Sequence, residues 1–134
     1  MATKVLVIED DERTRRLYKA AMAFQGMNVS TAANAAQGFK KFLSFKPDLV
    51  ILDIMLSGDG EMNIIKKFRE HGATHSLPVV ILSDLKDESI RKEASILGAC
   101  EYLIKSENSI GDLITKVRTI LKIDVGKGTK SAKK

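Results

Sequence analysis

Charged side chains follow three short apolar runs of the chain, and their positions make them candidates for shared chemistry. Each lies directly after a run of strand length: Glu9 and Asp10 after residues 5–8, Asp53 after residues 49–52, and Lys105 after residues 102–104. A continuous apolar run is typical of a strand buried in a parallel sheet, and open parallel sheets gather functional groups at the carboxyl ends of their strands. We therefore expect these groups to meet at one site.

The carboxylates among them predict a site for a hard cation. Two such charges about 4 Å apart repel by roughly 4 kcal/mol at an effective dielectric constant near 20, so Glu9, Asp10 and Asp53 need a cation or a proton. Oxygen ligands in a shallow site favour magnesium, which keeps several waters and takes one or two carboxylates. His71 and His75 lie away from the strand ends, so we expect them at the surface and no zinc site.

Asp53 is the candidate nucleophile. With a cation to neutralise it, a carboxylate can attack a phosphoryl group and form an acyl phosphate. Asp53 ends the strongest apolar run of the chain, and Ser83 ends another run at residues 79–82. The hydroxyl of Ser83 and the ammonium of Lys105 are expected to stabilise phosphoryl oxygens, as donors and cations do in phosphoryl transfer.

The elements that must position these groups alternate along the chain. Apolar runs of strand length alternate with stretches of helical period, which indicates βα units and a parallel sheet. Asp11, Asn34 and Asp87 are suitable helix N-caps. The expected strands cover residues 5–8, 27–31, 49–53, 79–82 and 102–104. The apolar stripes of the expected helices are Leu17, Ala20, Ala21 and Phe24; Phe39, Phe42 and Leu43; Ile64, Ile65 and Phe68; Ile90, Ala94 and Leu97; and Ile110, Leu113, Ile114, Val117 and Leu121.

Connections of this length favour right-handed crossovers, which leads to a doubly wound α/β fold. Five βα units in such a fold commonly take the strand order 2-1-3-4-5. In that order the first and third strands are neighbours, and the fourth and fifth lie beyond the third. The strand ends then line up Asp10, Asp53, Ser83 and Lys105.

Length and charge predict one domain with a basic tail. The chain has 134 residues, of which 44% are hydrophobic and 29% charged, as is ordinary for a globular domain. We expect the domain over residues 1–122 and a disordered tail over 123–134. The net charge is +5, but residues 124–134 contribute four lysines and one aspartate to it. Because that tail has no aromatic residue to stack on bases, a specific nucleic-acid site is not expected.

Other features point to a cytoplasmic protein without a membrane span. No apolar stretch approaches the roughly 20 residues that a spanning helix needs. The first residues lead straight into a strand, with no separate signal-peptide region. Cys100 is a single cysteine beside an apolar strand, and we expect it to be a small core residue without a catalytic role.

Four segments in order carry a resemblance to a known family. They are Val-Leu-Val-Ile-Glu9-Asp10-Asp11, Pro47-Asp48-Leu49-Val50-Ile51-Leu52-Asp53-Ile54-Met55-Leu56, Leu77-Pro78-Val79-Val80-Ile81-Leu82-Ser83, and Gly98-Ala99-Cys100-Glu101-Tyr102-Leu103-Ile104-Lys105. Together they resemble a receiver domain of the two-component response regulators, over roughly residues 3–122. The resemblance implies the flavodoxin-like receiver fold with the same strand order.

The resemblance also implies a role for each site residue. Asp53 would be the phosphoacceptor, and Glu9, Asp10, Asp53 and the backbone carbonyl of Met55 would hold magnesium. Ser83 would be the switch hydroxyl, Lys105 the phosphate-sensing lysine, and Tyr102 the aromatic that turns inward on activation. The family receives its phosphoryl group from a histidine kinase or phosphotransfer protein.

Three positions depart from the family pattern. Ser57 stands four residues after the phosphoacceptor, where proline is usual. Asp84 follows the switch hydroxyl, where a small residue is usual, and we expect its carboxylate to point to solvent. Ser106 replaces the usual proline after Lys105, so a cis-proline turn is absent. These changes bear on the rate and strength of switching.

We interpret the chain as a stand-alone receiver whose output passes through its surface. Phosphorylation is expected to switch the face formed by the fourth helix, fifth strand and fifth helix for binding an unknown downstream protein or for homodimerisation. Such a protein is not an enzyme beyond catalysing its own phosphorylation and dephosphorylation. Two alternatives are a phosphorylation-independent interaction module and a small magnesium-dependent phosphohydrolase.

Overall fold

The structure, a computed structural model, describes residues 2–54, 59–71 and 77–122, and it alternates strands and helices as predicted. The order of elements is β1 (Lys4–Ile8), α1 (Glu12–Phe24), β2 (Asn28–Ala32), α2 (Ala35–Phe45), β3 (Leu49–Asp53), α3 (Asp59–Glu70), β4 (Val79–Ser83), α4 (Glu88–Ile96), β5 (Glu101–Ile104), the 3₁₀ helix η1 (Lys105–Glu107) and α5 (Ile110–Leu121). The tail expected over residues 123–134 lies outside the described residues.

The five strands form one parallel sheet in the order β2-β1-β3-β4-β5, which confirms the predicted fold class. The register places Leu52 beside Ile8 of β1, and Asp53 beside Leu82 of β4. At the next step Ser83 lies beside Ile104. The functional groups after these strands therefore begin at nearly the same level of the sheet edge.

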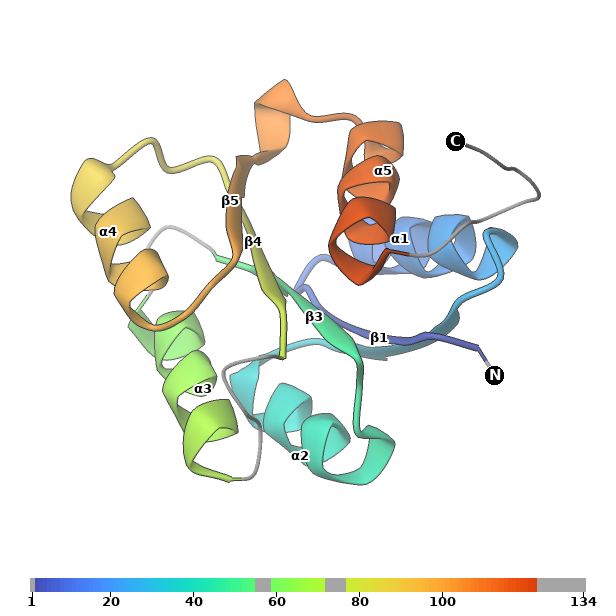
Figure 1. The fold of residues 1–134 in the computed structure, drawn as a ribbon, viewed down its shortest axis with the longest axis horizontal. Helices are drawn as coiled ribbons and strands as arrows, with labels where there is room; N and C mark the ends of the chain where they lie inside the picture. Colours follow the sequence, from blue (N-terminus) through green and yellow to red (C-terminus); the bar gives the residue numbers. More distant parts are fainter. Residues whose placement is uncertain (1, 55–58, 72–76, 123–134) are drawn as a thin grey trace.

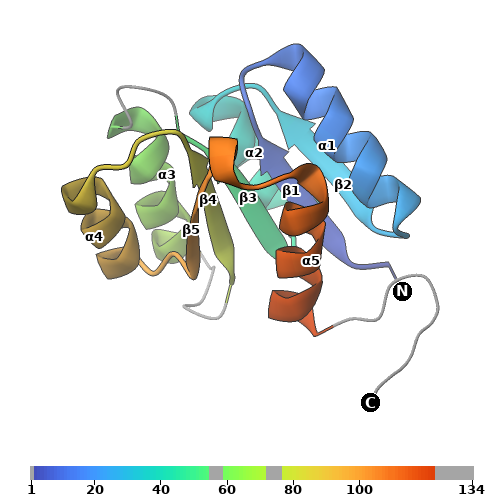
Figure 2. The same ribbon diagram turned by 90° about the horizontal axis from the view of Figure 1, so that it is seen from above.

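Helices cover both faces of this sheet, as Figures 1 and 2 show. On one face α1 and α5 pack over a cluster that contains residues of β1, β3 and β4, such as Val7 and Ile51. On the other face α2, α3 and α4 pack over a second cluster, which includes Leu52 and Phe68. Every residue of β3 and β4 is buried, as their continuous apolar runs predicted.

Helix starts follow the local sequence. The side chains of Asp11, Asn34 and Asp87 cap α1, α2 and α4 as predicted, each accepting a hydrogen bond from a backbone N–H of the first turn. Ser109 caps α5, where Asp112 completes a capping box with it. These caps fix where each helix begins after the sheet edge.

The apolar stripe predicted for α1 is wrong in most of its members. Leu17 is 56% exposed and Phe24 is 87% exposed, and Ala20 is exposed too. The buried side of the helix is the neighbouring stripe, in which Met22 is fully buried and Tyr18 packs against the same core. Apolar residues occupy two adjacent sides of α1, and the connection from β1 decides which side meets the sheet.

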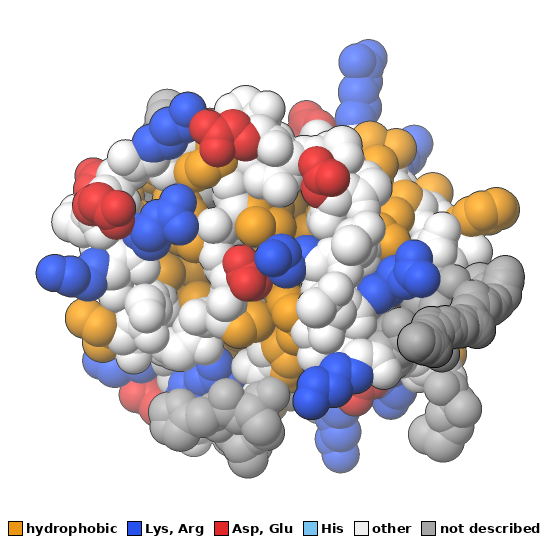
Figure 3. Space-filling view, turned by 45° about the horizontal axis from the view of Figure 1, so that its top comes forward, with side chains coloured by type: hydrophobic (Ala, Val, Ile, Leu, Met, Phe, Trp, Pro, Cys, Tyr) orange, Lys and Arg blue, Asp and Glu red, His pale blue; other side chains and the backbone are white. Residues whose placement is uncertain are grey.

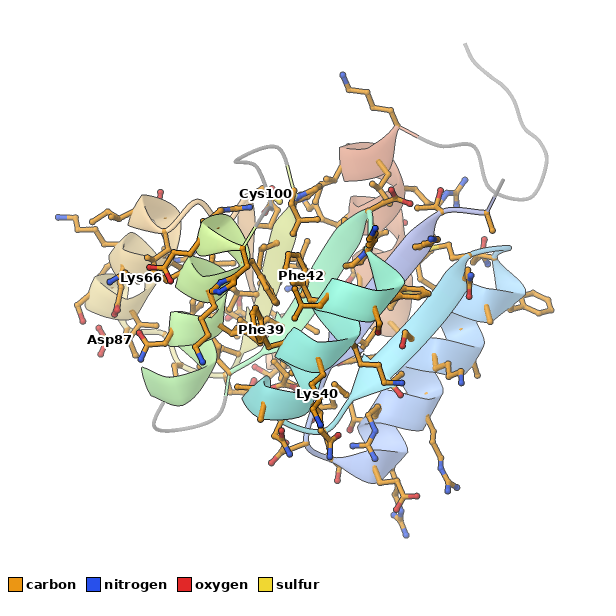
Figure 4. All side chains as sticks on the ribbon, turned by 90° about the horizontal axis from the view of Figure 1, so that it is seen from below. Phe39, Lys40, Phe42, Lys66, Asp87 and Cys100 are labelled. Atoms are coloured by element: carbon orange, nitrogen blue, oxygen red, sulfur yellow. The ribbon has the colours of Figure 1, made fainter. Side chains whose placement is uncertain are left out.

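Aromatic side chains join α2 to α3. The ring centroid of Phe42 lies 6.1 Å from that of Phe39 and 4.4 Å from that of Phe68, and Figure 4 shows both α2 phenylalanines in this region. Leu43, predicted on the same inner side, is half exposed. Gly38 lets α2 approach β1, because a Cβ there would lie 2.6 Å from Cδ1 of Ile8.

Arg69 joins the end of α3 to the end of α4. Its guanidinium donates hydrogen bonds to the carbonyl oxygens of Leu77 and Gly98, each at 3.1 Å. Gly98 has φ +95°, a backbone conformation that favours glycine, and it ends the turn after α4. The C-terminal end of α4 is therefore fixed to α3.

Two further predictions about single residues have different outcomes. Cys100 is exposed and not a core residue (Figure 4), although its thiol lies 3.5 Å from the carbonyl oxygen of Val79. His71 is exposed, as expected, and its ring packs edge-on against Phe39 with centroids 5.0 Å apart. His75 lies outside the described residues. None of the described helices is both long and apolar enough to span a bilayer.

Candidate functional site

The carboxyl ends of β1, β3 and β5 bring three of the predicted charged groups into contact. The Lys105 Nζ lies 2.5 Å from Oδ2 of Asp53 and 3.4 Å from Oε1 of Glu9. Lys105 follows β5, so its side chain reaches across the end of β4 to Asp53 on β3. The structure thus places these groups together as the strand order predicted.

Glu9 is a buried carboxyl group at the end of β1. Only 1% of the residue is exposed, and its Oε2 accepts a hydrogen bond from the backbone N–H of Asp11 at 2.9 Å. Burial, together with the neighbouring Asp53, raises the pKa of Glu9 to about 8, although the Asp11 N–H and Lys105 act in the opposite direction. Burial and Asp53 therefore favour the protonated form of Glu9, and a bound divalent cation would favour its ionised form.

Asp53 is buried at the end of the central strand, with 4% of the residue exposed. Its two carboxylate oxygens differ. Lys105 holds Oδ2, whereas the buried Oδ1 has no hydrogen-bond partner among the described residues. Burial lowers the pKa of Lys105, but the hydrogen bond and charge of Asp53 outweigh this and raise the pKa above its ordinary value. Lys105 is therefore a permanent cation beside Asp53.

Asp10 does not join this contact, because its side chain is exposed. Its loop is fixed from another direction, since the Arg15 guanidinium donates to the carbonyl oxygen of Glu9 at 2.9 Å and lies 3.4 Å from that of Asp10. Arg15 was not among the predicted site residues. Its partners are backbone carbonyl oxygens before α1, which no pattern of side-chain types indicates.

Ser83 and Tyr102 both bind Leu85, in the loop between β4 and α4. The Ser83 hydroxyl oxygen accepts a hydrogen bond from the backbone N–H of Leu85 at 3.0 Å, and the Tyr102 hydroxyl donates to its carbonyl oxygen at 2.9 Å. Tyr102 is buried, and the Arg91 guanidinium lies 4.9 Å from its ring centroid. In this structure the aromatic side chain is turned inward.

The same loop contacts the segment after β5. Asp84 is exposed, as predicted, and its Oδ1 accepts a hydrogen bond from the backbone N–H of Ser106 at 3.0 Å. Lys86 and Glu107 form an exposed ion pair with a distance of 2.8 Å between Nζ and Oε2. Asp84 and Ser106, two separate departures from the family pattern in the sequence, therefore bind each other in the structure.

The residues fit a magnesium ion in their chemistry. The donor groups are all oxygens, and Oδ1 of the buried Asp53 has no partner within the described part of the chain. In that same part, no three carboxylate, imidazole or thiol groups converge as a ready metal site. Magnesium takes only one or two protein carboxylates and completes its shell with waters and phosphate oxygens, so such convergence is not required. Met55, predicted to offer a backbone carbonyl, lies outside the described residues.

Charge is mixed over the surface near these strand ends. Figure 3 shows Lys and Arg side chains dispersed over this face and interspersed with Asp and Glu. Among the described residues on that face, the basic side chains do not merge into one continuous patch.

Comparison with known proteins gives a consistent result. The sequence model of the response regulator receiver domain family matches residues 5–118. The KDP operon transcriptional regulatory protein KdpE of Escherichia coli is 36% identical over 121 residues, which cover 90% of this chain and 52% of that protein. The transcriptional regulatory protein KdpE of Staphylococcus aureus is 32% identical over 123 residues, covering 92% of this chain and 52% of that protein. The chain spans about half the length of these relatives.

Solved structures agree with the fold. A two-component response regulator from Clostridium difficile superposes with a TM-score of 0.80 and 29% sequence identity, covering 90% of this chain and 96% of that one. The likeness extends over nearly all the described elements.

Proposed function

The chain belongs to the response regulator receiver domain family of two-component signalling, and from this premise we propose that Asp53 accepts a phosphoryl group in a magnesium-dependent reaction. The donor is a histidine kinase or phosphotransfer protein. The acyl phosphate then changes the face formed by α4, β5 and α5, which binds a downstream protein or a second copy of the chain.

One observation carries this proposal. Asp53 is buried at the end of the central strand, with one oxygen held by Lys105 and the other without a partner among the described residues. A buried carboxylate oxygen left without a hydrogen bond is costly, so its retention supports a functional role. Oδ1 is therefore open to a magnesium ion or to the phosphoryl group.

The transfer step assigns a task to each neighbouring group. A carboxylate oxygen of Asp53 attacks phosphorus, a P–O bond forms, and the bond from phosphorus to the donor's imidazole nitrogen breaks. Lys105 compensates the negative charge from its position on Oδ2, and the Ser83 hydroxyl turns to donate to a phosphoryl oxygen. Magnesium would supply further positive charge for the phosphoryl oxygens, and Glu9, Asp10, Asp53 and the carbonyl of Met55 would hold it.

The proposed switch begins at Ser83. Its hydroxyl accepts from the Leu85 N–H in the present arrangement, and the Leu85 carbonyl accepts from Tyr102. When Ser83 turns toward a phosphoryl group, Leu85 loses one of its two contacts and the loop before α4 shifts. Because Tyr102 lies on β5 under Arg91 of α4, this shift reaches the proposed binding face.

Incubation with magnesium and a small acyl phosphate donor tests the assignment of Asp53. We expect intact-mass spectrometry to detect one added phosphoryl group on the wild-type chain and none on Asp53→Asn. Asp48→Asn is the matched control, because Asp48 is an exposed aspartate just before the other end of the same strand. It should be modified as the wild type is.

The outcomes also separate the alternatives. Rapid multiple turnover of the donor, with no accumulated acyl phosphate, would indicate a phosphohydrolase. Absence of any modification would indicate a phosphorylation-independent interaction module. Modification that persists in Asp53→Asn would assign the acceptor to another residue. For output, an unchanged sedimentation profile and partner affinity after phosphorylation would contradict the proposed switch.

A further inference from the structure

Asp84 and Ser106 are bonded across the sheet edge, although they are 22 positions apart. Oδ1 of Asp84 lies 3.0 Å from the backbone nitrogen of Ser106. The register that places Ser83 beside Ile104 sets the residues after both strands next to each other. The bond needs an N–H at position 106, and a proline there would have none.

The accepting carboxylate supplies a cap that η1 does not provide for itself. Ile104, the residue before this 3₁₀ helix, makes no side-chain capping bond. The first N–H groups of a helical turn have no partner within the turn and need an outside acceptor. Asp84 meets this need from the β4–α4 loop, and Lys105 is the first residue of the turn that it caps.

Two neighbouring contacts join the same pair of segments. Leu85 accepts from the Tyr102 hydroxyl, and Lys86 pairs with Glu107. The ion pair is exposed on both sides and adds little on its own. The Asp84 bond differs from it because its donor is a backbone N–H, so the bond constrains the main chain and not only a flexible side chain.

We propose that Asp84 is a positioning residue for the phosphoryl transfer described above, on which this inference rests. Its bond to the Ser106 N–H fixes the chain after Ser83 relative to the chain around Lys105. The Ser83 hydroxyl and the Lys105 ammonium, which contact the phosphoryl group in the proposed reaction, thereby keep a fixed position relative to each other. The bond also turns the negative charge of Asp84 toward η1 and away from an incoming phosphoryl group.

The test compares Asp84→Asn with Asp84→Ala. Asparagine removes the charge but keeps an acceptor oxygen, whereas alanine removes both. The readout is the rate of acyl phosphate formation with magnesium and a small acyl phosphate donor. Because asparagine differs from alanine by a neutral hydrogen bond, a bond of ordinary strength predicts a rate about three- to tenfold lower for alanine than for asparagine. Rescue by asparagine separates positioning from a simple charge effect.

A proline variant examines the other partner of the bond. Ser106→Pro removes the donor N–H, so the ratio of the Asp84→Asn and Asp84→Ala rates should fall to one in that background, as for coupled partners in a double-mutant cycle. Asp87 provides the matched control, because it caps the neighbouring helix α4 from the same loop. Asp87→Ala and Asp87→Asn should react at equal rates.

Hydrogen exchange at the Ser106 amide completes the test. Protection should be lost in Asp84→Ala and kept in Asp84→Asn. Loss of protection with equal rates would reduce Asp84 to a structural cap and overturn the inference. A rate ratio that persists in the Ser106→Pro background would overturn it too. If the wild type takes up no phosphoryl group, the proposed function itself fails, which is a different result from equal rates in reactive variants.

Discussion

The buried carboxyl of Glu9 predicts that folding stability falls as pH rises through neutrality. The folded-state pKa is about 8, against an ordinary value of 4.5. Below pH 4.5 both the folded and unfolded chains hold this proton. Between these values the unfolded chain releases it and the folded chain keeps it, so a rise in pH favours unfolding.

The size of this effect follows from the two pKa values. Between the two pKa values, each pH unit lowers the free energy of unfolding by about 1.4 kcal/mol. Because titration is incomplete near each pKa, the total decrease between pH 5 and pH 7.5 is about 3 kcal/mol. Because Lys105 contacts both Glu9 and Asp53, this titration is a property of the three groups together. The lower limit of pH 5 avoids the titration of Asp11, whose pKa is lowered by hydrogen bonds from Thr14.

Urea unfolding at several pH values measures the effect. The free energy of unfolding of the wild type should fall by about 3 kcal/mol relative to that of Glu9→Gln, which has no proton to release. Glu70→Gln, at the exposed end of α3, should keep the wild-type pH dependence. Magnesium should flatten the wild-type curve by favouring ionised Glu9. Parallel curves for wild type and Glu9→Gln would refute the buried, protonated state.

Three further predictions concern stability and are measured by the same unfolding experiment. Gly38→Ala should destabilise the fold by about 1–2 kcal/mol, since overpacking against Ile8 outweighs the gain in helix propensity. Adding Ile8→Val should restore most of this stability, and no restoration would contradict the assigned clash. Ser109→Ala should cost about 1 kcal/mol by removing the cap of α5, with a cost near zero as the contrary result. Met22→Ala should cost about 2–5 kcal/mol, whereas Phe24→Ser should change stability by less than about 0.5 kcal/mol; a large effect at Phe24 would contradict the orientation of α1.

Features that depend on neighbouring residues in the chain were predictable from the sequence. Strands such as β3 and β4 are visible in the sequence as continuous apolar runs. The predicted N-caps Asp11, Asn34 and Asp87 each lie directly before a helix. The strand order followed from general rules of βα connection. The contact of Lys105 with Asp53 followed in turn, because the order places their strand ends two strands apart.

Features that depend on competition between surfaces were not predictable. Helix α1 has apolar residues on two sides, and only its fit to the sheet shows that Met22 is inside and Phe24 outside. Cys100 lies beside a buried strand but in the turn before it, where solvent reaches. The bond between Asp84 and Ser106 needs the register of β4 and β5, which no local pattern specifies.

The hydrogen bond from the Arg69 guanidinium to the carbonyl oxygen of Gly98 has a mechanical consequence for α4. It anchors the C-terminal end of the helix, whereas the N-terminal end follows the loop that contains Leu85. The nine residues of α4, at about 1.5 Å each, make the helix about 13 Å long. It can rotate about its C-terminal end, where Arg69 holds it. In the proposed switch, a small shift of the loop would move the N-terminal end of α4 and leave its C-terminal end in place. A partner would then detect a change of helix angle and not a displacement of the whole helix.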